Sequence, residues 1–330
     1  MNKPRVAITV GDPSGIGPEI AAAALADASV LELCDPVMYA PPAGRRFAPG
    51  VLSAEAGRAA YELIVRAVAD ARAGLVDAVT TAPISKEAFR LAGLPWSGHT
   101  DLLGHLTDAP HVAMMFESDV LRVVLATVHV PLADVPRCLT RASLEATLRL
   151  TARELPRFGV HTPRIAVAGL NPHAGEHGLF GDEEARVIEP AIAACRAEGL
   201  TVAGPYPGDT VFLRAMRGEF DVVVACYHDQ GLIPVKLLAF GRAVNVTLGL
   251  PIIRTSVDHG TAFDIAGQGR ADAGSLVAAV QLAARLARPG AAVAAATARS
   301  ESGPTSVATA RSESGPTSVA TARSAVAGNQ

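Results

Sequence analysis

The chain has 330 residues, of which 49% are hydrophobic, 18% charged and 4% aromatic, so it is long enough for two domains with mostly aliphatic cores. Its 29 basic and 32 acidic residues give a net charge of −3, which excludes the broad positive field of a nonspecific nucleic-acid binder. We find no signal peptide and no apolar run of membrane length. We therefore expect a cytoplasmic protein without nucleic-acid or membrane partners.

The predicted elements alternate between short β-branched strands and longer amphipathic helices, which is typical of βα units around a mostly parallel sheet. In chain order we expect strand Arg5–Val10, helix Ala54–Ala71, strands Ala78–Thr81 and Leu121–Thr127, helix Ser143–Leu155, strand Arg164–Ala168, helix Asp182–Cys195, strands Phe220–Ala225 and Ala243–Leu248, and helix Ser275–Leu286. Polar motifs follow these strands. Open parallel sheets bind their ligands there, at the carboxyl ends of the strands.

Two further features concern the whole chain. The cysteines Cys34, Cys138, Cys195 and Cys226 are widely spaced, form no CxxC pair and lie in apolar surroundings, which predicts buried thiols without disulfides. Beyond about Pro289, the 12-residue unit ATARSESGPTSV occurs twice in succession. It offers almost no apolar surface to bury, so we predict that residues 291–330 form a disordered tail.

The first motif, GDPSGIGPE at Gly11–Glu19, lies between a predicted strand and a predicted helix. Its glycines allow a tight turn and close approach of the backbone to a ligand, and Pro18 suits the first turn of a helix. The motif is not GxGxxG, so it does not predict a Rossmann site. It is equally compatible with a simple turn in which Asp12 and Glu19 are capping or solvated carboxylates.

Three histidines, His129, His173 and His228, each follow a predicted strand, and acidic residues such as Glu176 and Asp229 lie nearby. Imidazole is a common ligand of catalytic metals, and three protein ligands leave room for a substrate. No local spacing such as HExxH connects them. Each histidine alone is compatible with an ordinary hydrogen-bonded loop residue.

The sequence offers two candidates for anion recognition, a set of dispersed residues and a short segment. Arg254, Lys236 and the His99-Thr100 pair offer donors for a phosphate or carboxylate, although they are also compatible with dispersed surface charge. The segment Thr81–Glu87 leaves a strand and opens a helix, whose amino terminus favours anions. A plain cap formed by Ser85 is the interpretation that we favour there.

Taken together, seven segments in order resemble the 4-hydroxythreonine-4-phosphate dehydrogenase family of vitamin B6 biosynthesis. They are GDPSGIGPE, TAPISKEA, SGHTD, ATVHVPL, GLNPHAGE, YHDQGL and NVTLGLPIIRTSVDHGTAFDIAG, and the resemblance spans about Arg5 to Leu286. It implies an α/β fold like that of isocitrate and isopropylmalate dehydrogenases, with two α/β/α domains and a cleft between them. The first domain is expected at residues 1–105 plus 245–290, and the second, carrying the metal histidines and dimer contacts, at 106–244.

The resemblance also implies the site. It assigns one divalent metal (Zn, Mg, Mn or Co) to His129, His173 and His228, and substrate contacts to His99, Thr100, Lys236, Asn245 and Arg254. Lys236, Asp229 and Asp209 are the implied catalytic residues near the substrate, and NAD or NADP is expected at Gly260, Thr261, Asp264 and Ala266. A homodimer whose subunits share the active site is implied as well.

The implied reaction oxidises the secondary alcohol of 4-phosphooxy-L-threonine, after which the β-keto acid loses CO2 and leaves 3-amino-2-oxopropyl phosphate. The chain departs from the family in its repeat tail and in the short segment 40–50, where an edge hairpin is expected to be missing. One alternative is a dehydrogenase acting on a four-carbon aldonate phosphate or a cyclic cis-diol acid. Another is a noncatalytic metal- or phosphate-binding protein. A third is a hydrolase, although the sequence has no GxSxG motif that would support it.

Overall fold

The structure is a computed structural model that describes residues 3–288, so the predicted tail lies outside the described residues. Within them, ten strands form one sheet in the order β2-β1-β3-β10-β9-β4-β5-β8-β6-β7. The strands are β1 (Arg5–Thr9), β2 (Asp35–Tyr39), β3 (Ala78–Thr81), β4 (Ala113–Glu117), β5 (Arg122–Leu125), β6 (Ile165–Ala168), β7 (Val202–Tyr206), β8 (Val222–Ala225), β9 (Val244–Leu248) and β10 (Arg254–Ser256). All six predicted strands are present, and no end is shifted by more than two residues.

The sheet is parallel toward both edges and antiparallel in the middle. The pairs β10–β9, β9–β4 and β4–β5 are antiparallel, and the other neighbours are parallel. The predicted mostly parallel sheet is thus confirmed, with a reversal at its centre. β10 is only three residues long, which explains why the sequence pattern did not predict it.

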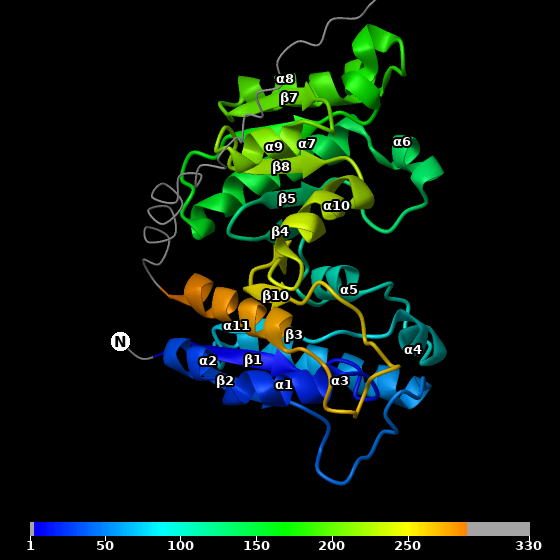
Figure 1. Ribbon diagram of the computed structural model, residues 1–330, viewed down its shortest axis with the longest axis vertical. Coiled ribbons are helices and arrows are strands. Elements are labelled where there is room, and N and C mark those ends of the chain that lie inside the picture. The colour runs from blue at the N-terminus through cyan, green and yellow to red at the C-terminus, as the bar shows by residue number, and fades with distance from the viewer. Residues whose placement is uncertain (1–2, 289–330) are drawn as a thin grey trace, which may run out of the picture.

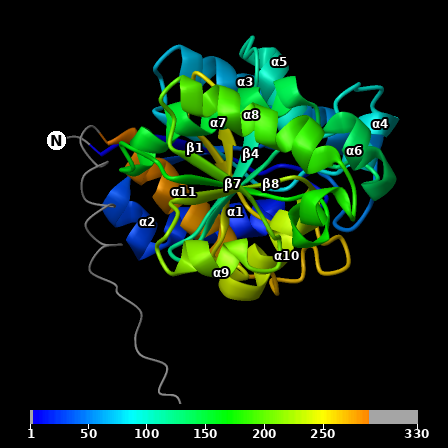
Figure 2. The same ribbon diagram turned by 90° about the horizontal axis from the view of Figure 1, so that it is seen from above.

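Helices cover both faces of the sheet, and in Figure 2 α7 and α8 lie on one side of β7 and β8 while α9 and α10 lie on the other. The α-helices are α1 (Gly17–Ala26), α2 (Ala28–Leu33), α3 (Ala54–Arg72), α4 (Lys86–Leu91), α5 (His99–Leu106), α6 (Val135–Cys138), α7 (Arg141–Glu154), α8 (Glu189–Ala197), α9 (Val211–Met216), α10 (His228–Ala239) and α11 (Gly274–Ala287). Short turns are η1 (Leu132–Asp134), η2 (Leu155–Phe158), η3 (Pro172–Gly178) and the π-helical η4 (Glu184–Ile188).

The hydrophobic core consists of three clusters. One gathers buried residues before position 104 and after position 249, in the lower half of Figure 1. The other two lie in the upper half and consist mainly of residues 113–248. Helix α11 contributes to both halves, since Leu276 and Val280 join the first cluster and Leu282 joins the second. The domain limits themselves remain a prediction.

The glycines of the first motif permit contacts that no other residue allows. A Cβ on Gly11 would lie 2.1 Å from the Pro83 carbonyl oxygen, and one on Gly17 would lie 1.8 Å from that of Val10. The motif therefore forms the tight strand-to-helix turn that its glycines predict. Neither of its acids is simply solvated: Asp12 is buried, and Glu19 accepts a bond from the Gly269 N–H at 2.9 Å.

Three other expectations can be compared with the fold. Three cysteines are buried free thiols, as predicted, but Cys138 is exposed. That prediction was wrong because α6 is a four-residue helix that buries only Val135. No strand lies between β2 and α3, in line with the missing edge hairpin. Among the described residues, we find no helix that is long and apolar enough to span a membrane.

Candidate active site

Arg254 lies buried in the middle of the sheet, on β10. Its side chain is only 2% exposed. The guanidinium donates to the hydroxyl oxygens of Thr247 (2.9 Å) and Thr81 (2.7 Å), and Nε has no partner. Within residues 3–288 it forms no ion pair. Because burial penalises a charge without a counter-ion, it lowers the pKa of Arg254 to about 9.

Polar side chains line up beside Arg254 at one level of the sheet. Cross-strand pairing joins Thr9 to Thr81, Thr81 to Ser256, and Ser256 to Asn245. Partners at one register position share a face of the sheet, and Arg254, two residues before Ser256, shares it too. The Oδ1 atom of Asn245 is buried without a partner. Asn245 and Arg254 therefore share one face of the sheet, and each has a buried polar atom without a hydrogen-bond partner.

His99 is placed near Arg254 at the start of α5. Burial and the positive charge of Arg254 hold the pKa of His99 well below its ordinary value, and its Nε2 is buried without a partner. Thr100 follows in the same turn and is half-buried. Of the predicted substrate contacts, His99, Asn245 and Arg254 thus each have an unpaired buried polar atom, the condition that a polar ligand relieves.

The histidines divide into a pair and a separate residue. The rings of His129 and His228 lie with their centroids 5.5 Å apart, at 38°. Burial, followed by the positive charge of Lys86, lowers the pKa of His129. His228 begins α10, and its Nδ1 contacts an Asp229 carboxylate oxygen at 2.7 Å. A carboxylate on one ring nitrogen leaves Nε2 free to bind a metal.

His173 lies on η3 beside Phe180, with ring centroids 6.1 Å apart. Residues His173 to His177 all have positive φ, from 43° to 82°. This left-handed turn is held by buried Glu184, which accepts from the Asn171 N–H at 2.8 Å and from its Nδ2 at 2.9 Å. Such a conformation costs non-glycine residues free energy, so these contacts must compensate for it.

The residues fit a metal ion in part. His129 and His228 form a pair of imidazoles, of which at least His129 favours the neutral form that binds metals. Within residues 3–288, however, no group of three or more His, Cys, Asp or Glu side chains is arranged to hold an ion. The single chain therefore brings together two of the three predicted ligands, and His173 is apart from them.

The predicted catalytic residues lie around α10. Asp229 is exposed and directed at His228, and exposed Lys236 is two turns further along the helix. Asp209 is exposed in the loop before α9. A Cβ on the neighbouring Gly208 would lie 3.1 Å from the Gln230 side chain, so this loop contacts the first turn of α10.

The predicted cofactor segment packs against the glycine motif. The Thr261 carbonyl accepts from the Ile16 N–H at 3.0 Å, and Ala266 is buried beside it in the first core cluster. Gly260 and Asp264 are exposed. Three carboxylates in these two segments, Asp12, Glu19 and Asp258, each have one buried oxygen without a partner. Free acceptors of this kind suit the hydroxyl groups of a ribose.

Sequence reasoning gave Thr247 no role in this region, and it named Thr81 and Lys86 only as parts of the segment Thr81–Glu87. Thr81 and Thr247 hold Arg254, and Lys86 lies within electrostatic range of His129. Thr247 lies two residues after Asn245 and therefore on the same face of β9, which is a signal that alternation along a strand provides. Ser85 caps α4 by accepting from the Ala88 N–H at 3.1 Å, which confirms the structural interpretation of that segment.

A family model described as pyridoxal phosphate biosynthetic protein PdxA matches residues 15–283 of the chain. The chain belongs to the PdxA family. A 4-hydroxythreonine-4-phosphate dehydrogenase of Desulfosudis oleivorans is 48% identical over 322 residues, which cover 85% of this chain and 95% of that protein. A D-threonate 4-phosphate dehydrogenase of Salmonella typhimurium is 44% identical over 327 residues, covering 87% of this chain and all of that protein (100%).

Solved structures agree with this membership. A crystal structure of 4-hydroxythreonine-4-phosphate dehydrogenase from Klebsiella pneumoniae has a TM-score of 0.78 and 42% identity, covering 86% of this chain and 100% of that one. A β-decarboxylating dehydrogenase from Thermococcus kodakarensis, at 16% identity and a TM-score of 0.52 over 91% of this chain and 88% of that one, shares the fold. The predicted α/β fold class, the family and the dehydrogenase class of this enzyme are thereby confirmed. A nicotinamide cofactor follows from that class.

Proposed function

We propose that this enzyme oxidises the secondary alcohol of 4-phosphooxy-L-threonine with NAD or NADP, and that the resulting β-keto acid loses CO2 to give 3-amino-2-oxopropyl phosphate for pyridoxal phosphate biosynthesis. The observation that carries the proposal is buried Arg254, whose hydrogen-bond partners in the described chain are two neutral hydroxyls. A buried guanidinium without a counter-ion is a strong site for a phosphate or carboxylate.

We assign a role to each residue, and their positions support the assignment. Arg254, Asn245 and the His99-Thr100 pair hold the anionic ends of the substrate, and Lys236 approaches from α10. Asp229 is engaged with His228 at 2.7 Å, so we assign it to orienting that ring, and we assign the proton relay to Lys236. The segments at 11–19 and 258–266 would hold the nicotinamide cofactor, which would supply the hydride acceptor.

His129 and His228 would hold a divalent ion, with His173 as the third ligand. When bound, such an ion lowers the pKa of a substrate hydroxyl and polarises a carbonyl oxygen. The neutral state that the surroundings of His129 favour supports this role.

We further propose a homodimer in which His173 reaches the His129–His228 pair of the other subunit. Large apolar side chains are exposed near both parts of the site: Leu237 (80%) and Phe240 (79%) at α10, and Leu179 (71%) beside η3. Exposed apolar groups next to functional segments are typical of an interface. A solution mass of twice 33.9 kDa by light scattering checks the dimer.

A second substrate, D-threonate 4-phosphate, is favoured by the equally extensive similarity to the Salmonella typhimurium dehydrogenase named for it. It carries a hydroxyl where the threonine derivative carries an amine, and Arg254 contacts neither position in our assignment. One assay distinguishes the two: NAD(P)H formation with each compound, with both cofactors and with Mg²⁺, Mn²⁺ or Zn²⁺. We expect the higher kcat/KM with 4-phosphooxy-L-threonine. Turnover of the threonate compound alone refutes the biosynthetic role.

A further inference from the structure

Arg254 is held by a chain of hydroxyl groups that fixes the direction of each hydrogen bond. Thr81 donates its hydroxyl proton to the Ser256 oxygen at 3.0 Å, and Ser256 donates its own to the Thr81 carbonyl at 2.8 Å. The lone pairs of the Thr81 hydroxyl are thus left to accept from Arg254, at 2.7 Å. A hydroxyl with its proton committed elsewhere is an oriented acceptor.

The second support, Thr247, comes from the other side of Arg254. Strand β10 lies between β3 and β9, so Thr81 and Thr247 reach the guanidinium from the strands on either side. A guanidinium has five N–H donors, of which these two bonds use one on each terminal nitrogen. The Nε donor and the remaining terminal donors are therefore free for a ligand.

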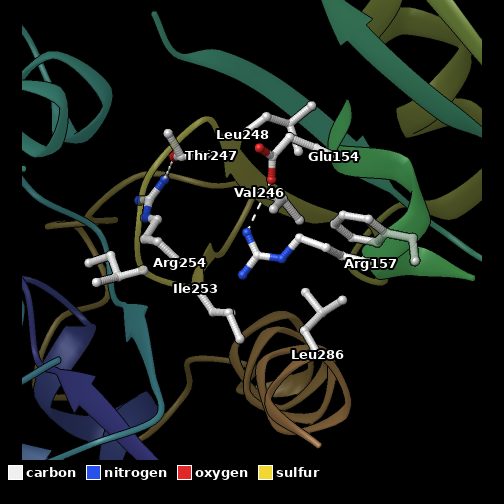
Figure 3. A pocket seen from close by; sticks show the side chains of 10 residues that line it. Glu154, Arg157, Val246, Thr247, Leu248, Ile253, Arg254 and Leu286 are labelled. Carbon is white, nitrogen blue, oxygen red and sulfur yellow. Dashed lines mark hydrogen bonds and ion pairs between the residues drawn. The ribbon is translucent and has the colours of Figure 1, made fainter. Parts of the chain in front are cut away.

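Neither support carries a charge, and within residues 3–288 no carboxylate pairs with Arg254. Figure 3 shows a pocket lined by Arg254 in which Glu154 is the one acidic residue, and the Arg254 side chain is bonded to Thr247. Glu154 instead pairs with Arg157 at 3.1 Å and with Arg153 at 3.3 Å. A carboxylate in place of either threonine would satisfy Arg254 internally and remove its attraction for a substrate anion.

We propose that Thr81 and Thr247 are positioning residues that fix the Arg254 guanidinium for the substrate's anionic group while leaving its charge uncompensated. This inference rests on the proposed function, which assigns that anion to Arg254. The threonines touch Arg254 and not the reacting atoms, so they act on substrate affinity more than on turnover.

The test compares Thr247→Val and Thr81→Val with Thr247→Ser, for both 4-phosphooxy-L-threonine and D-threonate 4-phosphate. Valine keeps the shape and removes the acceptor, whereas serine keeps it. We expect each valine variant to raise KM and the calorimetric Kd, measured without cofactor, by about 10-fold with kcat within about 2-fold. Thr247→Ser should remain within about 2-fold of the wild type.

Thr80→Val is the matched control. Thr80 is equally buried on β3 but faces the other side of the sheet, where its hydroxyl bonds to that of Thr255 at 2.9 Å. Any loss of substrate affinity in Thr80→Val equal to that in Thr81→Val would mean that a buried threonine matters only for the sheet. Thermal unfolding of all the variants identifies those that are merely destabilised.

Arg254→Lys separates the two proposals. If this variant binds the four-carbon phosphates as the wild type does, the anion is not at Arg254 and the proposed site itself fails. If Arg254→Lys loses at least about 10-fold in affinity while both valine variants bind normally, the anion site stands and the positioning role is wrong. A parallel loss of kcat in the valine and serine variants also overturns it.

Discussion

The proposed anion site around Arg254 and the turn that carries His173 are built in opposite ways. The first lies on adjacent strands, where register alone places Thr81, Ser256 and Asn245 side by side. The second lies on a left-handed turn that depends on one buried carboxylate, Glu184. The contacts of Arg254 with Thr81 and Thr247 form within one chain, and the second region is separate from the histidines it is expected to join. Strand pairing therefore determines the positions of the proposed anion-binding residues, whereas the proposed metal ligands depend on a turn that lies apart from the histidine pair.

The largest expected effect, and the strongest test of this comparison, comes from substituting the histidines. We expect His173→Ala and His228→Ala each to lower kcat by at least about 100-fold, because each removes a metal ligand. Bound metal, measured by elemental analysis of the purified protein, should fall in both.

Mixing these two variants tests whether His173 acts across the subunits. A dimer of one His173→Ala and one His228→Ala subunit keeps one intact site if the ligands come from both chains, so co-refolded variants should recover activity. If mixing restores nothing, then all three ligands act within one subunit. Wild-type metal content in His173→Ala would exclude that residue as a ligand.

An intermediate effect is expected from the carboxylate behind the turn. Glu184→Gln replaces one of the two acceptor oxygens that hold Asn171 with an amide donor, and should weaken metal binding by about 10-fold through the looser His173 turn. Competition titration measures the affinity, and hydrogen exchange of the amides at 171–178 should become faster.

The neighbouring Glu183 supplies the control for that variant. It accepts one side-chain hydrogen bond, from the Asn171 Nδ2 atom at 2.7 Å, whereas Glu184 also accepts from the Asn171 backbone N–H. Glu183→Gln should therefore cost less than Glu184→Gln in both measurements. Equal losses would show that the acidic pair, and not Glu184, supports the turn.

The smallest effect concerns pH and the anion site. Burial is the main reason that the folded-state pKa of His99 is well below 6.5. Between the two pKa values, His99 is protonated in the unfolded chain and neutral in the folded protein. The free energy of unfolding should therefore fall as the pH drops below about 6.5, down to the folded pKa. Urea unfolding at pH 7 and pH 5 should show a smaller decrease in His99→Gln than in the wild type. Exposed His161→Gln is the control, and an unchanged slope in His99→Gln would contradict the burial argument.

Much of the fold could be predicted because short stretches of sequence determine most of its helices and strands. Runs such as Ala78–Thr81 and Ala54–Arg72 have a single period and clear ends, and they fold as expected. β10 could not be predicted, because three residues carry no periodicity. The exposure of Cys138 was missed for a related reason: its apolar surroundings do not reveal that α6 is too short to bury it.

The candidate site likewise contains residues that local motifs predict and contacts that they do not. Arg254 and Asn245 were expected from the motifs. The contact of Arg254 with Thr81 was not, because it joins residues 173 positions apart in the chain through the pairing of β10 with β3. The roles assigned to the histidines, Lys236, Asp209 and the cofactor segment remain predictions.

The sequence by itself determined the family, the α/β class and the residue types available for catalysis, because these depend on motifs and local patterns. Only the tertiary structure decided that Arg254 is buried between two hydroxyls without a carboxylate, and that His129 meets His228 but not His173. The physical reason is that charge compensation and ligand geometry depend on distances between strands and loops, and side chains far apart in the chain set those distances.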